Sequence, residues 1–360
     1  MKKILFSAHS LDIGGIETAL VTLLNELQKK EYDITLVLEK KEGIFLKEIN
    51  PKIKIIEYRP SQSKNIIKRK MVNLYNRIKF IINNKNKFDF SASFATYSNA
   101  GAFVARTASK NSCLWGHANY KTLFKNDIDE MKKFFKEKKY DKFKHIVFVS
   151  KEGRNTFISV FPEMKEKTIV CNNIINNKKI EELSNEKIDL KKEEITTFLN
   201  VGRHEERQKK LSKIIEATKK LKEENYKIKI LFIGDGPDEE KYKKLVKENK
   251  LEKHIIFLGR KKNPYPYFKI SDVVILTSDY EGYPVVFLES MLLNKPIITT
   301  KVSDYEEIEG KYGYTTTKET SDIYEKMKLF IENGFKIKEP FNAEKYNKEI
   351  IEKLEKLFNS

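Results

Sequence analysis

Residues 3–38 read KILFSAHSLDIGGIETALVTLLNELQKKEYDITLVL, and this stretch decides the fold. A short apolar run at Lys3–Ser7 predicts a strand, and apolar residues at helical spacing over Ile16–Lys30 predict a helix. Ile34–Leu38 is a second apolar, β-branched run. A strand, a helix and a strand in this order form a βαβ unit, in which the two strands run parallel.

The same alternation of strands and helices continues along the chain. Further strands are predicted at Phe88–Phe94, Ser112–Trp115, His145–Val149, Thr196–Val201, Ile228–Ile233, Ile255–Leu258, Val273–Thr277 and Pro296–Thr300. Helical patterns such as Lys209–Glu223 and Asp238–Asn249 separate them. This alternation is typical of doubly wound parallel sheets with helices on both faces.

A polar, lysine- and glutamate-rich stretch at Asn176–Glu194 interrupts the alternation and predicts an interdomain linker. We therefore predict an α/β protein with two Rossmann-like domains, at residues 1–180 and 195–340. The segment 341–360 carries a helical pattern at Ala343–Phe358, which we expect to return to the first domain. A length of 360 residues suits two domains, since a domain takes roughly 100–200 residues.

The chain is strongly basic. It has 70 Lys and Arg against 52 Asp and Glu, a formal net charge of +18, and 40% hydrophobic residues, enough for a sizeable core. The positive charge suits anionic partners such as nucleotides, phosphates, nucleic acid or an acidic membrane leaflet. The sequence carries no RRM, KH or zinc-finger signature, so we expect no nucleic-acid partner.

Cysteine use and hydropathy bound the location of the protein. Cys113 and Cys171 are far apart and show no metal-ligand spacing, which indicates neither a disulfide framework nor a zinc site and fits a reducing compartment. The N-terminal apolar run ends after Phe6 and predicts a strand instead of a signal peptide. No apolar run approaches the roughly 18 residues of a spanning helix. We expect a cytoplasmic protein, soluble or peripheral at the inner face of the cytoplasmic membrane.

Glycine-containing turns follow several predicted strands. Gly14-Gly15 opens the first helix, and Gly234-Asp235 follows a later strand. Glycine lets the backbone approach a ligand, and a helix N-terminus can hold an anion, although an ordinary tight turn has the same pattern. Gly202-Arg203 ends another strand ahead of Lys209. An arginine and a lysine at this offset can bind one diphosphate, the first bidentately and the second as a point charge.

The strongest functional pattern is DYEGYPVVFLESM at Asp279–Met291. Its two glutamates bracket a Gly-x-Pro, and Pro284 fits the first turn of a helix, so Glu281 belongs in the loop and Glu289 about one turn inside the helix. A carboxylate in an otherwise apolar helix is costly without a partner. Both side chains can therefore face one ligand, where Glu281 would accept hydrogen bonds from sugar hydroxyls and Glu289 would hold a ribose diol. The alternative is a pair of glutamates exposed at the surface.

These motifs together resemble retaining glycosyltransferases of the GT-B fold, in particular glycosyltransferase family 4. The matching pieces are Gly14–Glu17, Trp115–His117, Phe148–Ser150, Asn173, Val201–Arg203 with Lys209, Phe232–Pro237, Phe257–Gly259 and Glu281–Pro284 through Glu289. They span residues 14 to 300 in family-like order and spacing. Asn263–Tyr267 and Ser278–Gly282 are similar to bacterial members that build capsule, lipopolysaccharide or other surface glycans.

The resemblance implies two Rossmann-like domains facing across a cleft and a hexosyltransferase-type activity. It implies retaining transfer of a sugar from a nucleotide-diphosphate sugar, with UDP favoured, to a growing surface glycan or a lipid-linked acceptor. No cofactor or metal is expected, because the helix dipole, Arg203 and Lys209 can supply the charge that a cation would otherwise supply. An epimerase similar to nucleotide-sugar 2-epimerases, or a non-catalytic sugar-binding GT-B protein, is the alternative.

The resemblance also implies residue roles. The catalytic set is His117, Glu281, Arg203 and Lys209, where the two basic residues bind the donor diphosphate, Glu281 contacts the donor sugar and His117 lies near the transferred sugar. The donor-binding set is Gly14, Gly15, Arg203, Lys209, Gly234, Asp235, Gly259, Glu281, Gly282, Tyr283, Pro284, Val285 and Glu289, with Glu289 on the ribose.

Two departures from the family pattern leave open points. The family lysine usually comes five residues after the arginine, where this chain has Gln208, so Lys209 and Lys210 both remain candidates for the phosphate contact. The glycine-rich turn usual after the last strand is replaced by Lys301–Tyr305. For that reason we do not assign Glu306 or Glu307 to the site.

The segment 61–88 is basic and apolar at once. It has no acidic residue, and its basic residues are Lys64, Lys68, Arg69, Lys70, Arg77, Lys79, Lys85 and Lys87. Ile66, Ile67, Val72, Leu74, Ile78, Phe80, Ile81 and Ile82 run between them. The pattern predicts an amphipathic helix at 64–87 that contacts an anionic leaflet, and a solvated helix face is an equal alternative.

Overall fold

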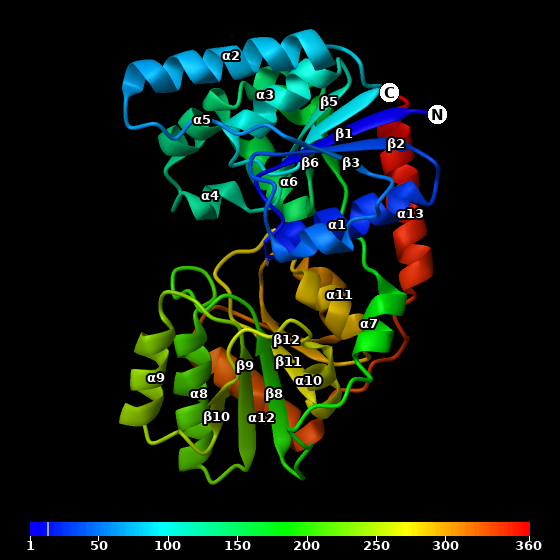
Figure 1. Ribbon diagram of the computed structural model, residues 1–360. Helices are drawn as coiled ribbons and strands as arrows, with labels where there is room; N and C mark the ends of the chain where they lie inside the picture. Colours follow the sequence, from blue (N-terminus) through cyan, green and yellow to red (C-terminus); the bar gives the residue numbers. More distant parts are fainter. Residues whose placement is uncertain (13) are drawn as a thin grey trace. The chain divides into compact units, whose positions relative to one another are not determined.

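The computed structural model describes residues 1–12 and 14–360 and divides into two compact units (Figure 1). Unit 1 consists of Met1–Ile174 and Lys345–Ser360, and unit 2 of Ile175–Glu344. Ile13, which precedes Gly14 in the predicted phosphate loop, lies outside the described residues.

Unit 1 is built on a parallel sheet of seven strands in the order β3-β2-β1-β4-β5-β6-β7. The strands are β1 (Lys3–Ala8), β2 (Asp33–Leu38), β3 (Lys54–Glu57), β4 (Phe90–Ser93), β5 (Ser112–Gly116), β6 (His145–Phe148) and β7 (Thr168–Val170). Strand β1 pairs with β2 from Lys3↔Asp33 and with β4 from Ile4↔Phe90. The strand order therefore reverses direction between β1 and β4, the switch point of a doubly wound sheet.

Helices pack around the unit 1 sheet. They are α1 (Gly15–Gln28), α2 (Ile66–Asn84), α3 (Asn99–Ala108), α4 (Tyr120–Leu123), α5 (Ile128–Glu137), α6 (Lys151–Val160) and α13 (Ala343–Phe358), with 3-10 turns at Ile44–Glu48, Tyr140–Lys142 and Pro162–Lys167. The ring of Phe6 on β1 lies about 6 Å from those of Phe90, Phe94 and Trp115, which centres the core on the middle strands.

The C-terminal helix packs on unit 1, beside strands from the start of the chain. The ring of Phe358 lies 4.6 Å from that of Phe90, and the side chain of Asn111 donates a 2.8 Å hydrogen bond to the carbonyl of Leu357. Lys30 donates to the carboxylate of Glu355 at 2.8 Å. Contacts with residues more than 200 positions earlier thus join the last helix to the first domain.

Unit 2 is built on a parallel sheet of six strands in the order β10-β9-β8-β11-β12-β13. The strands are β8 (Thr196–Val201), β9 (Ile228–Ile233), β10 (Ile255–Phe257), β11 (Val273–Leu276), β12 (Ile297–Thr300) and β13 (Gly313–Thr316). Relative to the first strand this order is 3-2-1-4-5-6, that of dinucleotide-binding Rossmann domains, with its switch point between β8 and β11.

Two helices, α8 and α12, supply much of the unit 2 core. The helices of unit 2 are α7 (Asn177–Leu183), α8 (Leu211–Glu223), α9 (Glu239–Glu248), α10 (Tyr265–Ile270), α11 (Val285–Leu292) and α12 (Thr320–Asn333), with a 3-10 turn at Tyr305–Glu307. Buried residues of α8 and α12, among them Ile214 and Phe330, share one apolar cluster with Phe198 and Ile230 of the sheet. Their burial anchors both helices and fixes the loops at the carboxyl ends of the strands.

The predicted fold class, two parallel-sheet α/β domains, is confirmed. Each strand predicted from the sequence appears within one or two residues at either end, but β3, β7 and β13 were not predicted. The predicted linker 176–194 contains the helix α7, and the units divide after residues 174 and 344. Among the described residues, no helix combines the length and the apolar character needed to cross a bilayer.

Candidate functional site

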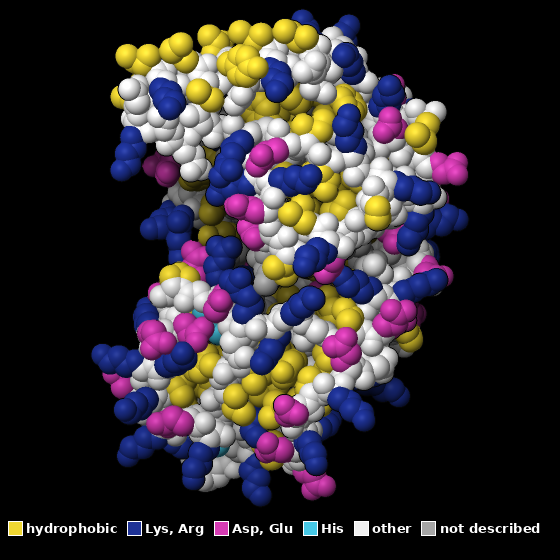
Figure 2. Space-filling model, in the orientation of Figure 1, with side chains coloured by type: hydrophobic (Ala, Val, Ile, Leu, Met, Phe, Trp, Pro, Cys, Tyr) yellow, Lys and Arg dark blue, Asp and Glu magenta, His cyan; other side chains and the backbone are white. Residues whose placement is uncertain are grey.

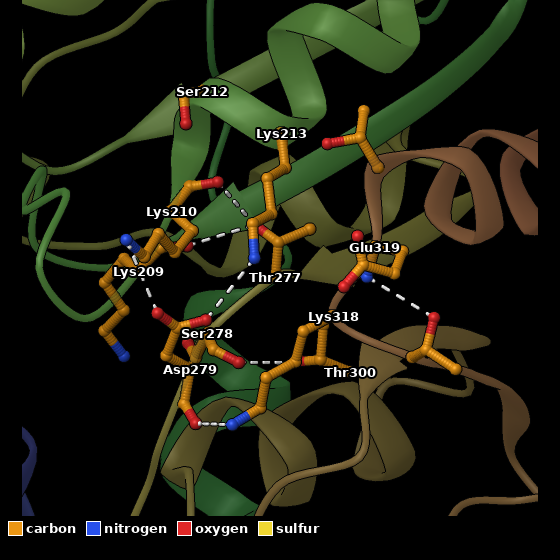
Figure 3. Close-up of polar contacts among 12 residues, drawn as sticks. Lys209, Lys210, Ser212, Lys213, Thr277, Ser278, Asp279, Thr300, Lys318 and Glu319 are labelled. Carbon is orange, nitrogen blue, oxygen red and sulfur yellow. Dashed lines mark hydrogen bonds and ion pairs between the residues drawn. The ribbon is translucent and has the colours of Figure 1, made fainter. Parts of the chain in front are cut away.

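The loops that follow β8 and β11 meet at the switch point of the unit 2 sheet. The backbone N–H of Asp279 donates to the carbonyl of Gln208 at 2.8 Å. The hydroxyl of Thr277 donates to the carbonyls of Lys209 and Lys210, each at 3.0 Å (Figure 3). These bonds connect two loops about 70 residues apart in sequence. Ligands of doubly wound sheets bind at this position, beyond the carboxyl ends of the strands.

Glu281 is the centre of a buried polar cluster in these loops. Its Oε1 lies 2.5 Å from Nζ of Lys209 and accepts a 2.6 Å hydrogen bond from the hydroxyl of Ser278. Its Oε2 accepts a longer bond of 3.3 Å from the amide of Gln208. The carboxylate side chain is only 8% exposed, so these three donors offset the cost of removing its charge from water.

Lys209 and Lys210 contact different carboxylates. Nζ of Lys210 lies 3.4 Å from Oδ2 of Asp279, and Lys213 and Lys318 also contact Asp279, through its side chain and its carbonyl (Figure 3). A Cβ atom at Gly202 would lie 3.5 Å from Cε of Lys209, which extends back over the end of β8. Lys210 has a left-handed backbone (φ 52°), and this reversal separates the two side chains. Only Lys209 therefore joins Gly202 and Glu281.

Arg203 lies on the same loop but outside the buried cluster. Its side chain is 68% exposed, and its Nη1 is 3.5 Å from Oε2 of Glu205. An exposed ion pair at this distance holds a side chain weakly. Arg203 is therefore able to reorient toward a ligand without breaking a buried contact.

The predicted glycine turns have a clear packing role. A Cβ at Gly234 (φ +137°) would lie 1.9 Å from the carbonyl oxygen of Gly202, closer than any side chain can approach. Gly259 (φ +67°) needs glycine for its backbone angle alone. Asp235 is half exposed and pairs with Arg260 at 2.7 Å. The glycines bring the loops after β8 and β9 together, and Asp235 lies at their surface.

Glu289 is buried in α11, as its place inside an apolar helix predicted. The residue is 7% exposed, and its Oε1 accepts a 3.1 Å hydrogen bond from the hydroxyl of Tyr265 on α10. Burial raises the pKa of Glu289 to about 7, and this bond opposes the rise. The raised pKa brings the titration of Glu289 close to neutral pH, so its charge can change when a ligand binds.

The segment before α11 is supported by the loop after β12. Pro284 is the N-cap residue of α11 and provides no side-chain cap to the helix N–H groups, which start at Val285. The hydroxyl of Tyr283 donates to Glu307 at 2.8 Å, and that of Ser303 donates to the carbonyl of Gly282 at 2.5 Å. Ser303 has a φ of 57°, a left-handed angle that glycine would adopt more easily.

In unit 1, His117 follows the end of β5. Its ring lies 4.6 Å from that of Phe94, and Nε2 is buried without a hydrogen-bond partner among the described residues. Burial lowers the pKa of His117 to about 4, so the imidazole is neutral at pH 7. A neutral ring with an unpaired nitrogen can accept a hydrogen bond from a ligand hydroxyl or donate one, depending on its tautomer.

Gly14 and Gly15 begin α1, also in unit 1. Gly14 is the N-cap residue, with an extended backbone and no side-chain cap for the first N–H groups of the helix. A Cβ at Gly15 would meet nothing within 4 Å, whereas one at Gly14 would contact the carboxylate of Glu17. The positive end of a helix dipole favours an anion, and at this N-terminus the carboxylate of Glu17 already lies close to Gly14.

The structure places Lys209, Glu281, Gly202 and the α11 N-terminal segment at one end of the unit 2 sheet. Sequence reasoning missed Gln208 and Ser278 as partners of Glu281, and Ser303 as a support for Gly282. The run Ser278–Gly282 was a signal for Ser278, whereas Gln208 appeared only as a departure from the family pattern. Among residues 1–12 and 14–360, no group of three or more His, Cys, Asp and Glu side chains is arranged to hold a metal ion.

Residues 181–356 match the family model described as glycosyl transferases group 1, and this range includes the whole Glu281 cluster. An uncharacterised glycosyltransferase of Methanocaldococcus jannaschii is 30% identical over 159 residues, 43% of this chain and 39% of that protein. The matches to this relative and to two further curated relatives cover 39%, 28% and 44% of the length of those proteins. The chain therefore spans less than half of each of the three.

Two longer matches cover both units. The N-acetylgalactosamine-N,N'-diacetylbacillosaminyl-diphospho-undecaprenol 4-alpha-N-acetylgalactosaminyltransferase of Campylobacter jejuni is 26% identical over 308 residues, 83% of this chain and 81% of that protein. The crystal structure of Anabaena HepE in complex with UDP-glucose superposes with a TM-score of 0.78 at 17% identity, over 99% of this chain and 100% of that chain. At this identity the structural match establishes the fold, which is GT-B.

Proposed function

Because residues 181–356 match the family model of glycosyl transferases group 1, we propose that this chain is a retaining, metal-independent glycosyltransferase. It transfers a sugar from a nucleoside-diphosphate sugar, with UDP as the favoured nucleotide, to a growing surface glycan or a lipid-linked acceptor. The observation that carries the proposal is the pairing of Lys209 with Glu281 at the switch point of the unit 2 sheet. The UDP-glucose complex of HepE and the diphospho-undecaprenol acceptor in the name of the Campylobacter relative support the choice of substrates.

Positive charge for the donor diphosphate comes from three sources in unit 2. Nζ of Lys209 is held near Gly202, Arg203 is free to reorient, and the N-terminus of α11 has no side-chain cap. As the glycosidic bond breaks, negative charge develops on the leaving diphosphate, and preorganised cations stabilise that charge most in the transition state. These groups supply the charge that a divalent cation supplies in other transferases, which supports metal independence.

The two glutamates bind the sugar and the ribose. Oε1 of Glu281 is committed to Lys209 and Ser278, while Oε2 has the longer bond to Gln208, which a sugar hydroxyl can replace. Glu289 accepts hydrogen bonds from the ribose diol as a carboxylate, so donor binding removes the proton that burial favours in the free protein.

The unit 1 residues are assigned by the chemistry of each position. Nε2 of the neutral His117 accepts a hydrogen bond from a hydroxyl of the transferred sugar, and Gly14 and Gly15 present the α1 N-terminus to phosphate. Retention follows a same-face path in which the leaving phosphate accepts the acceptor proton. In this path no side chain forms a covalent intermediate.

Product analysis tests this proposal. The protein is incubated with EDTA and UDP-, GDP-, ADP- or CMP-sugars, and NMR follows nucleotide release and the anomeric form of the sugar. We expect one donor to be hydrolysed slowly with its configuration retained, and Glu281→Ala to abolish this hydrolysis. Interconversion of the nucleotide sugar to its 2-epimer would identify an epimerase instead, and binding without turnover in the presence of surface-glycan acceptors would identify a non-catalytic sugar-binding protein.

A further inference from the structure

The helix α2 directs its apolar side toward solvent. Its outer stripe consists of Ile67, Met71, Leu74, Tyr75, Ile78 and Ile82, whose exposed fractions range from 49% to 71%. Spacings of three and four residues place these side chains on one face of the helix. Figure 2 shows the row of hydrophobic atoms along the edge where Figure 1 draws α2. An exposed apolar surface of this continuity marks an interaction site.

The inner face of α2 is polar by comparison. Phe80 is the one residue of α2 classed as buried, and its ring packs 5.4 Å from that of Tyr58. Asn73 accepts a 2.7 Å hydrogen bond from the backbone N–H of Ser61, and Asn76 donates a 3.1 Å bond to the carbonyl of Arg59. The ring of Phe80, the two amides and Arg77, whose guanidinium lies 5.2 Å from the ring of Phe103, attach the helix, and none of them belongs to the outer stripe.

Basic side chains border the stripe on both sides. At 100° per residue, Lys70 falls along one border and Lys68 and Lys79 along the other, whereas the guanidinium of Arg77 packs inward, 5.2 Å from the ring of Phe103. The segment 61–88 has eight basic residues and no acidic one. A second copy of this helix would bring like charges together, whereas an anionic surface complements them. An apolar stripe flanked by cations is the pattern of helices that lie in a membrane interface.

We propose that the outer stripe of α2 binds the surface of an anionic lipid bilayer. The apolar side chains enter the boundary between headgroups and acyl chains, and the bordering lysines contact lipid phosphates. The helix lies in the plane of the interface. Binding requires neither donor nor acceptor, so the inference stands apart from the proposed function; where the acceptor is lipid-linked, it brings unit 1 to the surface that presents it.

Vesicle flotation of the full chain tests the proposal. Vesicles of phosphatidylglycerol mixed with phosphatidylcholine are compared with pure phosphatidylcholine, at low and at high salt. We expect binding to the anionic vesicles, release at high salt and at least a tenfold weaker partition into the neutral ones, because electrostatic attraction and apolar burial act together.

Variants separate the two contributions. Leu74→Glu and Ile78→Glu place a charge in the stripe and should each lower vesicle binding at least tenfold. Lys68→Gln and Lys79→Gln should each lower it about fivefold, since a cation at an anionic surface contributes about 1 kcal/mol. The matched controls are Lys241→Gln and Lys244→Gln on α9, which remove the same charge elsewhere and should leave binding unchanged.

Three results would overturn the proposal. Equal binding to neutral and anionic vesicles would remove the role of the cations, and unchanged binding in Leu74→Glu and Ile78→Glu would remove the role of the stripe. A wild-type dimer in analytical ultracentrifugation that Leu74→Glu converts to a monomer would assign the stripe to a second copy. Thermal unfolding of each variant, which we expect to match the wild type because these side chains are exposed, excludes misfolding as the cause.

Discussion

The Glu281 cluster and the helix α2 depart from the usual distribution of side chains in opposite directions. In the cluster, a carboxylate and an ammonium are removed from water and compensated by each other, by Ser278 and by Gln208. On α2, isoleucine, leucine and methionine side chains are exposed to water, and cations surround them. Each arrangement costs free energy in the isolated protein.

The two regions differ in the kind of binding group that they present to a ligand or partner. The cluster holds charge in a fixed position, so a charged ligand meets groups that are already desolvated and oriented. The apolar side chains of the α2 stripe are exposed to water in the isolated protein. Covering them with a partner lowers the free energy of the system. Substitutions in the cluster should therefore change chemistry, whereas substitutions on the stripe should change attachment and leave folding intact.

The largest expected effect separates the adjacent lysines of the unit 2 loop. We expect Lys209→Ala to lower kcat/KM for the donor by about 100–1000-fold, the loss typical of one preorganised charge-stabilising group. Lys210→Ala, whose Nζ contacts Asp279 instead of Glu281, should lose less than about tenfold. Steady-state nucleotide release measures both. Equal losses of kcat/KM in the two variants would contradict different roles for Lys209 and Lys210.

The next effect concerns the exposed arginine of the same loop. Arg203→Ala should lower kcat/KM about 10–100-fold, because a charge-assisted contact with phosphate contributes about 1.5–3 kcal/mol. Its melting temperature should stay within about 1 °C of the wild type, since a surface ion pair contributes little to stability. Full activity of Arg203→Ala would assign the diphosphate to Lys209 and the α11 N-terminus alone.

A smaller effect follows from the buried carboxyl of Glu289. Its pKa of about 7 means that it is mostly protonated below pH 7 in the free protein, whereas ribose hydroxyls bind the carboxylate. Affinity for the donor should therefore fall as pH falls below about 7, by up to about tenfold per pH unit. Calorimetric titration of a nucleotide sugar, whose diphosphate does not titrate in this range, measures the slope.

Glu289→Gln is the control for this pH dependence. It keeps the size of the side chain and removes the titrating group, so its donor affinity should be lower at pH 8 and nearly constant between pH 6 and pH 8. A pH slope that persists in Glu289→Gln would assign the proton to another residue.

The smallest effect compares the two faces of α2. Ile78→Ala removes an exposed side chain and should change the free energy of unfolding by less than about 0.5 kcal/mol. Phe80→Ala, two residues away on the inner face, should lower it by about 3–5 kcal/mol, as for other buried aromatic residues. Urea denaturation measures both. A large loss in Ile78→Ala would show that the stripe belongs to the core of unit 1.

Much of the fold could be predicted because central parallel strands are buried on both faces and appear as apolar runs. The three missed strands, β3, β7 and β13, all lie at sheet edges. There the pattern weakens: β3 is a half-exposed KIIE and β13 is GYTT, in which glycine and threonine give no apolar run. The order of the strands is a tertiary property and came only from the structure.

The charged residues of the candidate site stand out in the sequence, and its neutral ones do not. Glu281, Glu289 and Lys209 stand out by motif and spacing, but the contacts of Gln208 and Ser278 with Glu281 depend on side-chain directions in two distant loops. The different contacts of Lys209 and Lys210 depend on a left-handed backbone at Lys210, which the sequence does not signal. The sequence also left open which way α2 presents its apolar side chains, because the same helical spacing fits a helix that turns them toward the core and one that turns them toward solvent.

The most direct test of the central claim is calorimetric titration of UDP into the protein with EDTA present, repeated with Lys209→Ala and Lys210→Ala. We expect the wild type to bind UDP without a divalent cation. We also expect Lys209→Ala to bind about 10–100-fold more weakly and Lys210→Ala to bind nearly as the wild type does. Binding that requires a divalent cation, or equal affinity in the wild type and Lys209→Ala, would contradict a diphosphate site built on Lys209 at the switch point of the unit 2 sheet.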